Sequence, residues 1–155
     1  MNNCVRVSKV NQDGCIIVRP LGTFLGFGGI VSINPYRELA ADVSPLGLGK
    51  TVKELLELSG PTSYHIKDIA KYNNETDSVV ASSLRERYFR KVKSAKSMAI
   101  AMTSVEVSIR KGGKSWRLER YDYDAGSDNH IVISTLRIAV AQGSAALGKN
   151  VLEML

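Results

Sequence analysis

Residues 136–155 read LRIAVAQGSAALGKNVLEML, a strand-like run followed by a turn and a helical pattern. Gly143 and Ser144 supply the turn, and the pattern predicts a helix from Ala145 to Leu155. We expect Ser144 to cap this helix, because a serine hydroxyl can accept a hydrogen bond from a free amide of the first turn. The apolar face of the helix, which we expect to be buried as far as the last residue, consists of Leu147, Val151, Met154 and Leu155.

The same unit occurs earlier in the chain, where Ser44 and Pro45 precede a second helical pattern. Its apolar residues are Leu48, Val52, Leu55 and Leu56, and each lies 99 residues before its counterpart in the closing helix. Gly49 and Gly148 occupy matching positions in the two copies. We interpret them as glycines that let each helix approach a sheet closely. Two similar amphipathic helices need a shared surface, and a sheet is the expected one.

The rest of the chain supplies candidate strands for this sheet. Turn residues lie at 11–14 and 111–114, each between two strand-like segments. We expect Pro20 to end the second strand. We also expect a β-bulge between Met102 and Val105, because the alternation of apolar and polar residues shifts by one position there. The expected strands are Val5–Val10, Cys15–Val18, Ile30–Ile33, Met98–Met102, Val105–Ile109, Trp116–Tyr121 and Ile131–Ile133. The predicted fold is a single α+β domain over residues 1–155, with a mostly antiparallel or mixed sheet and two similar strand–helix units.

Composition narrows the class of protein. The chain has 155 residues, 44% of them apolar, and a formal charge of +6, which favours an acidic partner. No apolar run approaches the roughly twenty residues that a membrane span needs, and residues 1–6 lack the apolar core of a signal peptide. We therefore expect a cytoplasmic protein. Cys4 and Cys15 are too few for a metal cluster or a redox motif, and we interpret both as buried apolar residues.

Motifs for catalysis, cofactors and metals are weak. Gly49, Lys50 and Thr51 resemble the end of a phosphate-binding loop, but Ser44 stands where that loop needs glycine and Pro45 removes an amide. His65 and His130 are the only histidines, and no spacing pairs either with a nucleophile or an acid. We therefore expect no enzyme activity, no cofactor and no metal. ATP hydrolysis at Lys50 remains a minor alternative.

Two charged stretches contain interleaved aromatic residues and are candidate partner-binding surfaces. Residues 84–96 are basic, and residues 121–129 form an acidic, aromatic loop in a basic protein. Aromatic and arginine side chains are the usual anchors of protein interfaces. The candidate binding residues are Tyr121, Asp122, Tyr123, Asp124 and Asp128 in the loop, and Arg85, Arg87, Arg90 and Lys93 in the basic stretch.

Three segments together resemble a known family. They are the Leu-Gly helix from Leu48 to Ser59, the basic aromatic run from Arg87 to Ser94, and the closing strand with Leu147 and Gly148. In this order they resemble the immunity proteins of bacterial contact-dependent growth inhibition systems, the CdiI family. The resemblance implies a cytosolic antidote without catalytic activity. Its partner would be the C-terminal toxin domain of an exoprotein, often a nuclease. The resemblance carries over no binding residues.

The favoured function is therefore neutralisation of a cognate nuclease toxin by stoichiometric protein–protein binding. The alternative is a nucleic-acid-binding module that uses the region from Arg85 to Arg120, whose affinity would fall steeply with salt.

Overall fold

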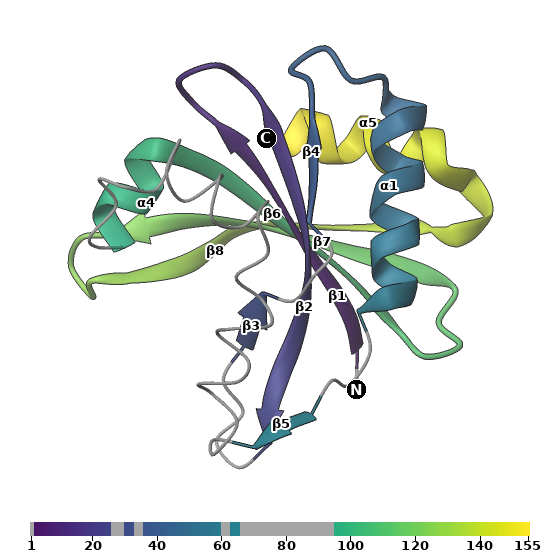
Figure 1. The fold of residues 1–155 in the computed structure, drawn as a ribbon, viewed down its shortest axis with the longest axis horizontal. Helices are drawn as coiled ribbons and strands as arrows, with labels where there is room; N and C mark the ends of the chain where they lie inside the picture. The colour runs from purple at the N-terminus through teal and green to yellow at the C-terminus, as the bar shows by residue number, and fades with distance from the viewer. Residues whose placement is uncertain (1, 26–29, 33–35, 60–62, 66–94) are drawn as a thin grey trace.

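The computed structural model describes residues 2–25, 30–32, 36–59, 63–65 and 95–155. Its strands form one twisted sheet in the order β3-β2-β1-β6-β7-β8, in which β4 and β5 also pair with β2 (Figure 1). All pairs are antiparallel except β2 with β5, so the predicted α+β class with a mostly antiparallel, mixed sheet is confirmed. The strands are β1 (Asn2–Val10), β2 (Ile16–Leu25), β3 (Ile30–Ser32), β4 (Arg37–Leu39), β5 (Ser63–His65), β6 (Met102–Arg110), β7 (Ser115–Asp124) and β8 (Asn129–Ala139). The helices are α1 (Pro45–Leu58), α4 (Ala95–Ala101), the 3-10 turn η3 (Val140–Gln142) and α5 (Gly143–Met154).

The first two strands form the predicted hairpin, but β2 does not end at Pro20. It continues to Leu25, and Pro20 lies opposite Val5 in the register. On the other edge of β2, β4 pairs with residues 16–18 and β3 with residues 21–23. Pro20 falls between these two paired ranges, where its missing amide hydrogen breaks no ladder.

The predicted strand Met98–Met102 is wrong, because Ala95–Ala101 forms the short helix α4 and β6 begins at Met102. A short apolar run does not distinguish a helix from a strand, and alanine, lysine and methionine are good helix formers. The expected bulge is absent too, since β1 and β6 pair in continuous register from Val10–Met102 to Asn2–Arg110. The apolar phase changes because Met102 and Val105 face opposite sides of the sheet, each with its own apolar cluster.

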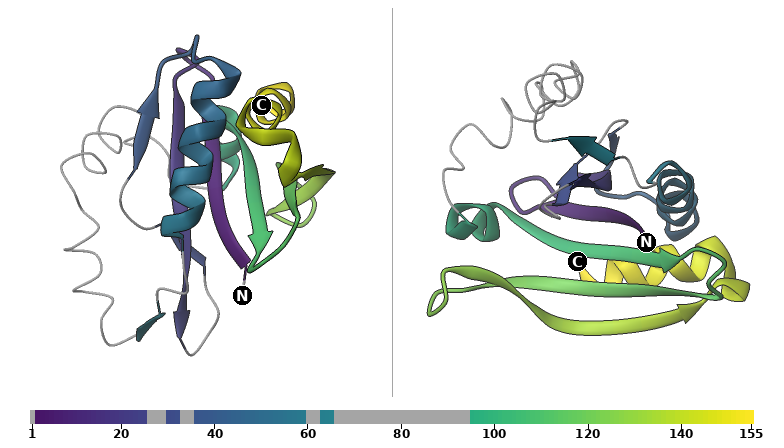
Figure 2. Two further views of the ribbon diagram at one scale, coloured as in Figure 1. Left: turned by 90° about the vertical axis from the view of Figure 1, so that its right-hand side faces the viewer. Right: turned by 90° about the horizontal axis from the view of Figure 1, so that it is seen from below.

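The main core lies between one face of the sheet and the two helices α1 and α5, which pack against each other and cross (Figure 2). The predicted apolar face of α1 is fully buried, and Ser44 caps the helix by accepting a hydrogen bond from the Gly47 amide at 3.1 Å. On α5, Leu147 and Val151 are buried, whereas Met154 and Leu155 are half-buried against the core. Ser144 is not the cap, because α5 already begins at Gly143 and has no side-chain cap.

The glycines of the shared Leu-Gly pattern bring the two helices close to each other, and not close to the sheet as expected. A Cβ atom on Gly49 would lie 1.8 Å from the carbonyl oxygen of Ser144, and one on Gly148 would lie 1.8 Å from that of Pro45. Pro45 and Ser144 each stand four residues before a glycine, so the contact is nearly symmetric. The repeated sequence therefore specifies one close helix–helix crossing, with both backbones in contact.

None of the helices in the described part of the chain is long and apolar enough to cross a membrane.

Substituting Gly49→Ala should destabilise the protein by about 3 kcal/mol, because the added methyl group forces the two helices apart. Alanine is otherwise favoured over glycine within a helix by about 1 kcal/mol, so a loss of stability would isolate the steric clash. Chemical denaturation measures the difference. Gly126→Ala is the control, since its Cβ would meet only ordinary contacts of 3.5 Å or longer. Equal stability of Gly49→Ala and the wild type would contradict the close crossing.

Candidate functional site

The β7–β8 hairpin carries the predicted acidic loop and extends away from α1 and α5 (Figure 1). Most of the expected loop is strand, because β7 continues to Asp124 and β8 begins at Asn129. The register of the two strands shifts between Arg120 and Tyr121, which marks a β-bulge. The tight turn is confined to residues 125–128. The candidate residues Tyr121 to Asp128 are therefore held on a hairpin and not on a long loop.

Asp124 holds the turn of this hairpin. Its carboxylate accepts hydrogen bonds from the Gly126 amide at 3.1 Å, the Ser127 amide at 3.2 Å and the Ser127 hydroxyl at 2.6 Å. The Ser127 hydroxyl and the Gly126 amide lower the pKa of Asp124, because they favour its charged form. Asp124 therefore has a structural role at the tip, although it was predicted only as a contact residue.

Asp128 and Tyr123 close the tip from the other strand. Asp128 adopts a φ of 52°, and the Tyr123 hydroxyl donates a hydrogen bond to its carboxylate. This hydrogen bond and the charge of Asp128 raise the pKa of Tyr123. The Tyr123 ring also meets the edge of the His130 ring, with 6.2 Å between centroids. Asp122 is exposed, and its one hydrogen bond within the described part of the chain is local, from the Tyr123 amide at 2.8 Å, so it is the tip aspartate most available to a partner.

Tyr121 points into a polar network on the sheet face opposite the helices. Its hydroxyl donates to Oε2 of the buried Glu106 at 3.2 Å, and Arg6 donates to Oε1 of Glu106 from Nε at 3.0 Å. Burial and the Glu106 carboxylate raise the pKa of Tyr121. Tyr121 thus joins the hairpin to the body of the sheet. Sequence reasoning missed Arg6 and Glu106, although both occupy polar positions within otherwise apolar strands.

Two further groups of this network have strongly altered acidity. Burial raises the pKa of the Cys4 thiol to about 12, assisted by the charge of Glu106. Burial and the nearby Arg6 lower the pKa of Arg19 to about 10. Arg19 donates to the Ser8 hydroxyl at 3.0 Å, while its buried Nε has no hydrogen-bond partner among the described residues. Cys4 therefore stays protonated at neutral pH and is a poor nucleophile.

The outer strand β8 adds an apolar surface beside the acidic tip. Within the described part of the chain it pairs only with β7, so no described strand lies along its other edge, which we call the open edge of β8. The exposed apolar residues of this edge, which are between 38% and 47% exposed, are Ile131, Val132, Ile133 and Leu136. An exposed apolar row on an open edge strand is typical of a surface that a partner covers. The sequence signal for it was the consecutive apolar run 131–133, which one buried face cannot accommodate.

A small pocket of about 60 Å³ lies where the hairpin leaves the body. It brings together two of the candidate residues, Tyr121 and Asp122, with Arg120, the last residue of the region indicated for nucleic acid, and with His130, which had not been included in the site. In the described residues, no hydrogen bond joins His130 to a carboxylate and no group of three or more potential ligands is placed to hold a metal.

The basic half of the predicted site lies outside the described residues. Arg85, Arg87, Arg90 and Lys93 all fall within residues 66–94, so the structure does not place them relative to the hairpin. The acidic half is brought together on one hairpin, with Asp122 exposed and Tyr121 half-buried. The candidate surface consists of the β7–β8 tip and the open edge of β8.

Comparison with known proteins identifies the fold. No protein-family model matches the sequence, and no curated protein matches it. A solved structure of a CdiA-CT/CdiI toxin and immunity complex from Yersinia pseudotuberculosis contains a chain with a similar fold. The TM-score is 0.66 at 13% identity, and the match covers 99% of this chain and 95% of that chain. A protein of unknown function from Neisseria meningitidis is also similar, with a TM-score of 0.58, 15% identity and 99% and 93% coverage.

These matches extend over nearly the whole of each chain, so the architecture is shared and not only a local motif. The chain has the fold of a component of a toxin and immunity complex. At such low identity the likeness concerns the fold, and surface residues have to be argued from this protein alone.

The protein should lose stability above pH 9 through Cys4. The unfolded thiol ionises near its ordinary pKa of 9.0, whereas the folded thiol stays protonated up to about 12. Between these two pKa values the native state binds one proton more than the unfolded state. The free energy of unfolding therefore falls by about 1.4 kcal/mol for each unit of pH in this range. Denaturant titrations at pH 9.5 and 10.5 measure the loss.

Cys4→Ser is the control for this titration, because it removes the ionisable thiol and keeps a small side chain. The variant should lose about 1.4 kcal/mol less than the wild type over that pH unit. Parallel losses in the two proteins would show that the burial of Cys4 is not the cause.

Proposed function

We propose that this protein is an immunity protein, which binds the nuclease toxin domain of a contact-dependent inhibition exoprotein and neutralises it in the cytoplasm. The observation that carries the proposal is the likeness of its fold, over nearly the whole chain, to a chain of a toxin and immunity complex. The order of the Leu-Gly helix, the basic aromatic run and the closing Leu-Gly unit, which resembles CdiI immunity proteins, supports the same function.

The β7–β8 hairpin is the proposed contact surface. Its tip carries Asp122, Asp124 and Asp128, and no lysine or arginine occurs between Tyr121 and Leu136. A nuclease needs a basic surface to hold its substrate's phosphates, so an acidic tip is complementary to it. The exposed apolar row of β8 would supply the desolvated centre of the interface, with the acids at its rim. The basic residues Arg85, Arg87, Arg90 and Lys93 are proposed as a second contact, to acidic groups of the toxin.

Stoichiometric binding is the proposed mechanism, without catalysis or a cofactor. A standard tight interface buries roughly 800 Å² on each partner. The hairpin tip and the open β8 edge together offer a continuous surface along one side of the molecule. Covering a toxin's substrate-binding face is sufficient for inhibition, because the substrate then has no access to it.

The direct test is co-expression with the C-terminal domain of a large exoprotein encoded immediately upstream. Cells that make this domain alone should stop growing, and cells that also make this protein should grow normally. The two proteins should also elute together in size-exclusion chromatography at one copy each. Growth arrest despite production of both soluble proteins would contradict the proposed function.

The contact surface is tested by Asp122→Lys, which reverses the charge of the one tip aspartate that does not hold the turn. Binding to the toxin domain should weaken at least about tenfold at low salt, and the loss should shrink as salt screens the new repulsion. Calorimetric titration at two salt concentrations measures both effects. Glu57→Lys is the matched control, because Glu57 is exposed on α1 and its substitution makes the same change of charge away from the hairpin.

A second variant tests the apolar part of the same surface. Ile131→Ser should also weaken binding, but with little dependence on salt, because it removes apolar contact area and not charge. Normal affinity in both Asp122→Lys and Ile131→Ser would remove the hairpin from the interface, while the co-expression result would still decide the function.

A further inference from the structure

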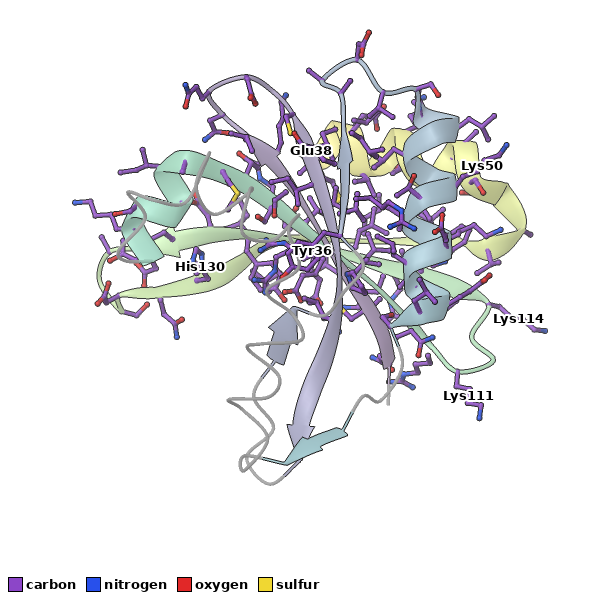
Figure 3. The ribbon with its side chains drawn as sticks, viewed as in Figure 1. Tyr36, Glu38, Lys50, Lys111, Lys114 and His130 are labelled. Carbon is purple, nitrogen blue, oxygen red and sulfur yellow. The ribbon has the colours of Figure 1, made fainter. Side chains whose placement is uncertain are left out.

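The end of the sheet opposite the β7–β8 tip carries a basic pocket of about 220 Å³. It lies beside the β6–β7 turn, where Lys111 and Lys114 project outward (Figure 3). Its described lining includes the three arginines Arg110, Arg117 and Arg137, together with the polar side chains of Asn2, Ser108 and Ser115. This pocket is separate from the proposed toxin-binding surface.

Strand register explains how the arginines meet. Ser108 pairs with Arg117 across β6 and β7, and Arg117 pairs with Arg137 across β7 and β8. These residues form one row on the sheet face opposite the helices, and Asn2 pairs with Arg110 at the end of β6. Two arginines placed directly opposite each other in an antiparallel pair repel, which costs stability in the absence of a counter-charge.

Few acids neutralise this end of the sheet. Arg117 forms an ion pair with Glu119 at 2.6 Å. Within the described part of the chain, no ion pair involves Arg110 or Arg137. Three arginines therefore line the pocket, Lys111 and Lys114 lie in the adjacent turn, and among the described residues one carboxylate, that of Glu119, pairs with these five cations. The turn brings them close, because the Gly113 amide donates to the Arg110 carbonyl oxygen at 2.7 Å.

We propose that this pocket binds a phosphate group of a nucleic acid. Guanidinium groups match the geometry of phosphate oxygens, and hydroxyl and amide side chains beside them can donate further hydrogen bonds. The pocket is smaller than the about 300 to 1,000 Å³ that enclose whole small-molecule ligands, so it fits one group of a larger chain. A bound phosphate would also relieve the repulsion between Arg117 and Arg137.

An acidic protein segment fits this pocket less well. Tight protein interfaces are anchored by aromatic or apolar side chains in desolvated pockets. The described lining offers one apolar side chain, the half-buried Ile109, among arginines and neutral polar groups. Part of this pocket falls in the Arg85–Arg120 region that the sequence indicated for nucleic acid, but Arg137 comes from a strand outside that region.

The test is binding of a fluorescein-labelled single-stranded RNA 12-mer to the full chain, measured by fluorescence anisotropy at low and moderate salt. The wild type should bind, and its affinity should fall as salt rises. The double variant Arg117→Gln/Arg137→Gln should bind at least about tenfold more weakly, equivalent to about 1.4 kcal/mol. Lys50→Gln/Lys53→Gln is the control, because it removes two charges from α1, which contributes no residue to the described lining, and should bind almost as well as the wild type.

Competition distinguishes the possible ligands. Inorganic phosphate should displace the RNA only weakly and at high concentration, because it corresponds to a single group of the RNA chain. If polyglutamate displaces the labelled RNA at a lower concentration of negative charges than unlabelled RNA does, the proposal is overturned in favour of an acidic protein. Equal losses in the arginine variant and the lysine control would overturn it as well, since they would reflect net charge alone.

Thermal stability separates binding from a structural role. Without ligand, Arg137→Gln should have an unchanged or higher melting temperature, because it removes the repulsion with Arg117. A lower melting temperature would mean that Arg137 supports the fold, and would overturn the interpretation of the pocket as a binding site.

Discussion

The contact between Gly49 and Gly148 is the constraint on which the rest of the structure depends. Two backbones that touch at this point leave no space for any side chain, so α1 and α5 form one closely packed pair. This pair covers the apolar face of a strongly twisted sheet, and the buried residues of five strands pack against it. The strands in turn hold both hairpin ends in place, the acidic tip at one end and the basic pocket at the other.

The second face of the sheet has a different physical character. Its inner rows combine a buried carboxylate, two arginines, a tyrosine and a thiol, joined across β2, β1, β6 and β7. Such a network is stable only when its members satisfy each other, because a buried polar group without a partner is costly. Tyr121 links this network to the β7–β8 hairpin, so the base of the proposed toxin-binding surface is anchored by the same interactions that stabilise the sheet. Arg19 and Arg137 have no carboxylate partner among the described residues, which leaves this face with excess positive charge.

Local sequence patterns were sufficient for the fold class, the apolar face of α1, the cap at Ser44 and the hairpin turns. They failed where two structures share one local pattern. Met98–Met102 is apolar enough for a strand, yet it is mostly helix, because good helix formers precede β6. Pro20 appeared to end a strand, and only the gap between β3 and β4 on the neighbouring edge shows why it is tolerated. For the site, sequence charge indicated the acidic residues, but the structural roles of Asp124, Asp128 and Tyr121 depend on hydrogen bonds that composition does not reveal.

The sequence by itself determined that two copies of a Leu-Gly unit form amphipathic helices on a mostly antiparallel sheet, because period and residue type act locally along the chain. It also determined that acidic and basic residues are segregated in different segments. Only the tertiary structure decided that the two glycines face each other. A glycine has no side chain that would indicate its neighbour, so the contact is defined only when both helices are in place. Strand register likewise decided that Arg117 and Arg137 lie side by side and that Glu106 meets Tyr121. Strand pairing places residues that are distant in the chain next to each other, and the strength of their electrostatic interaction depends on the distance between them in space.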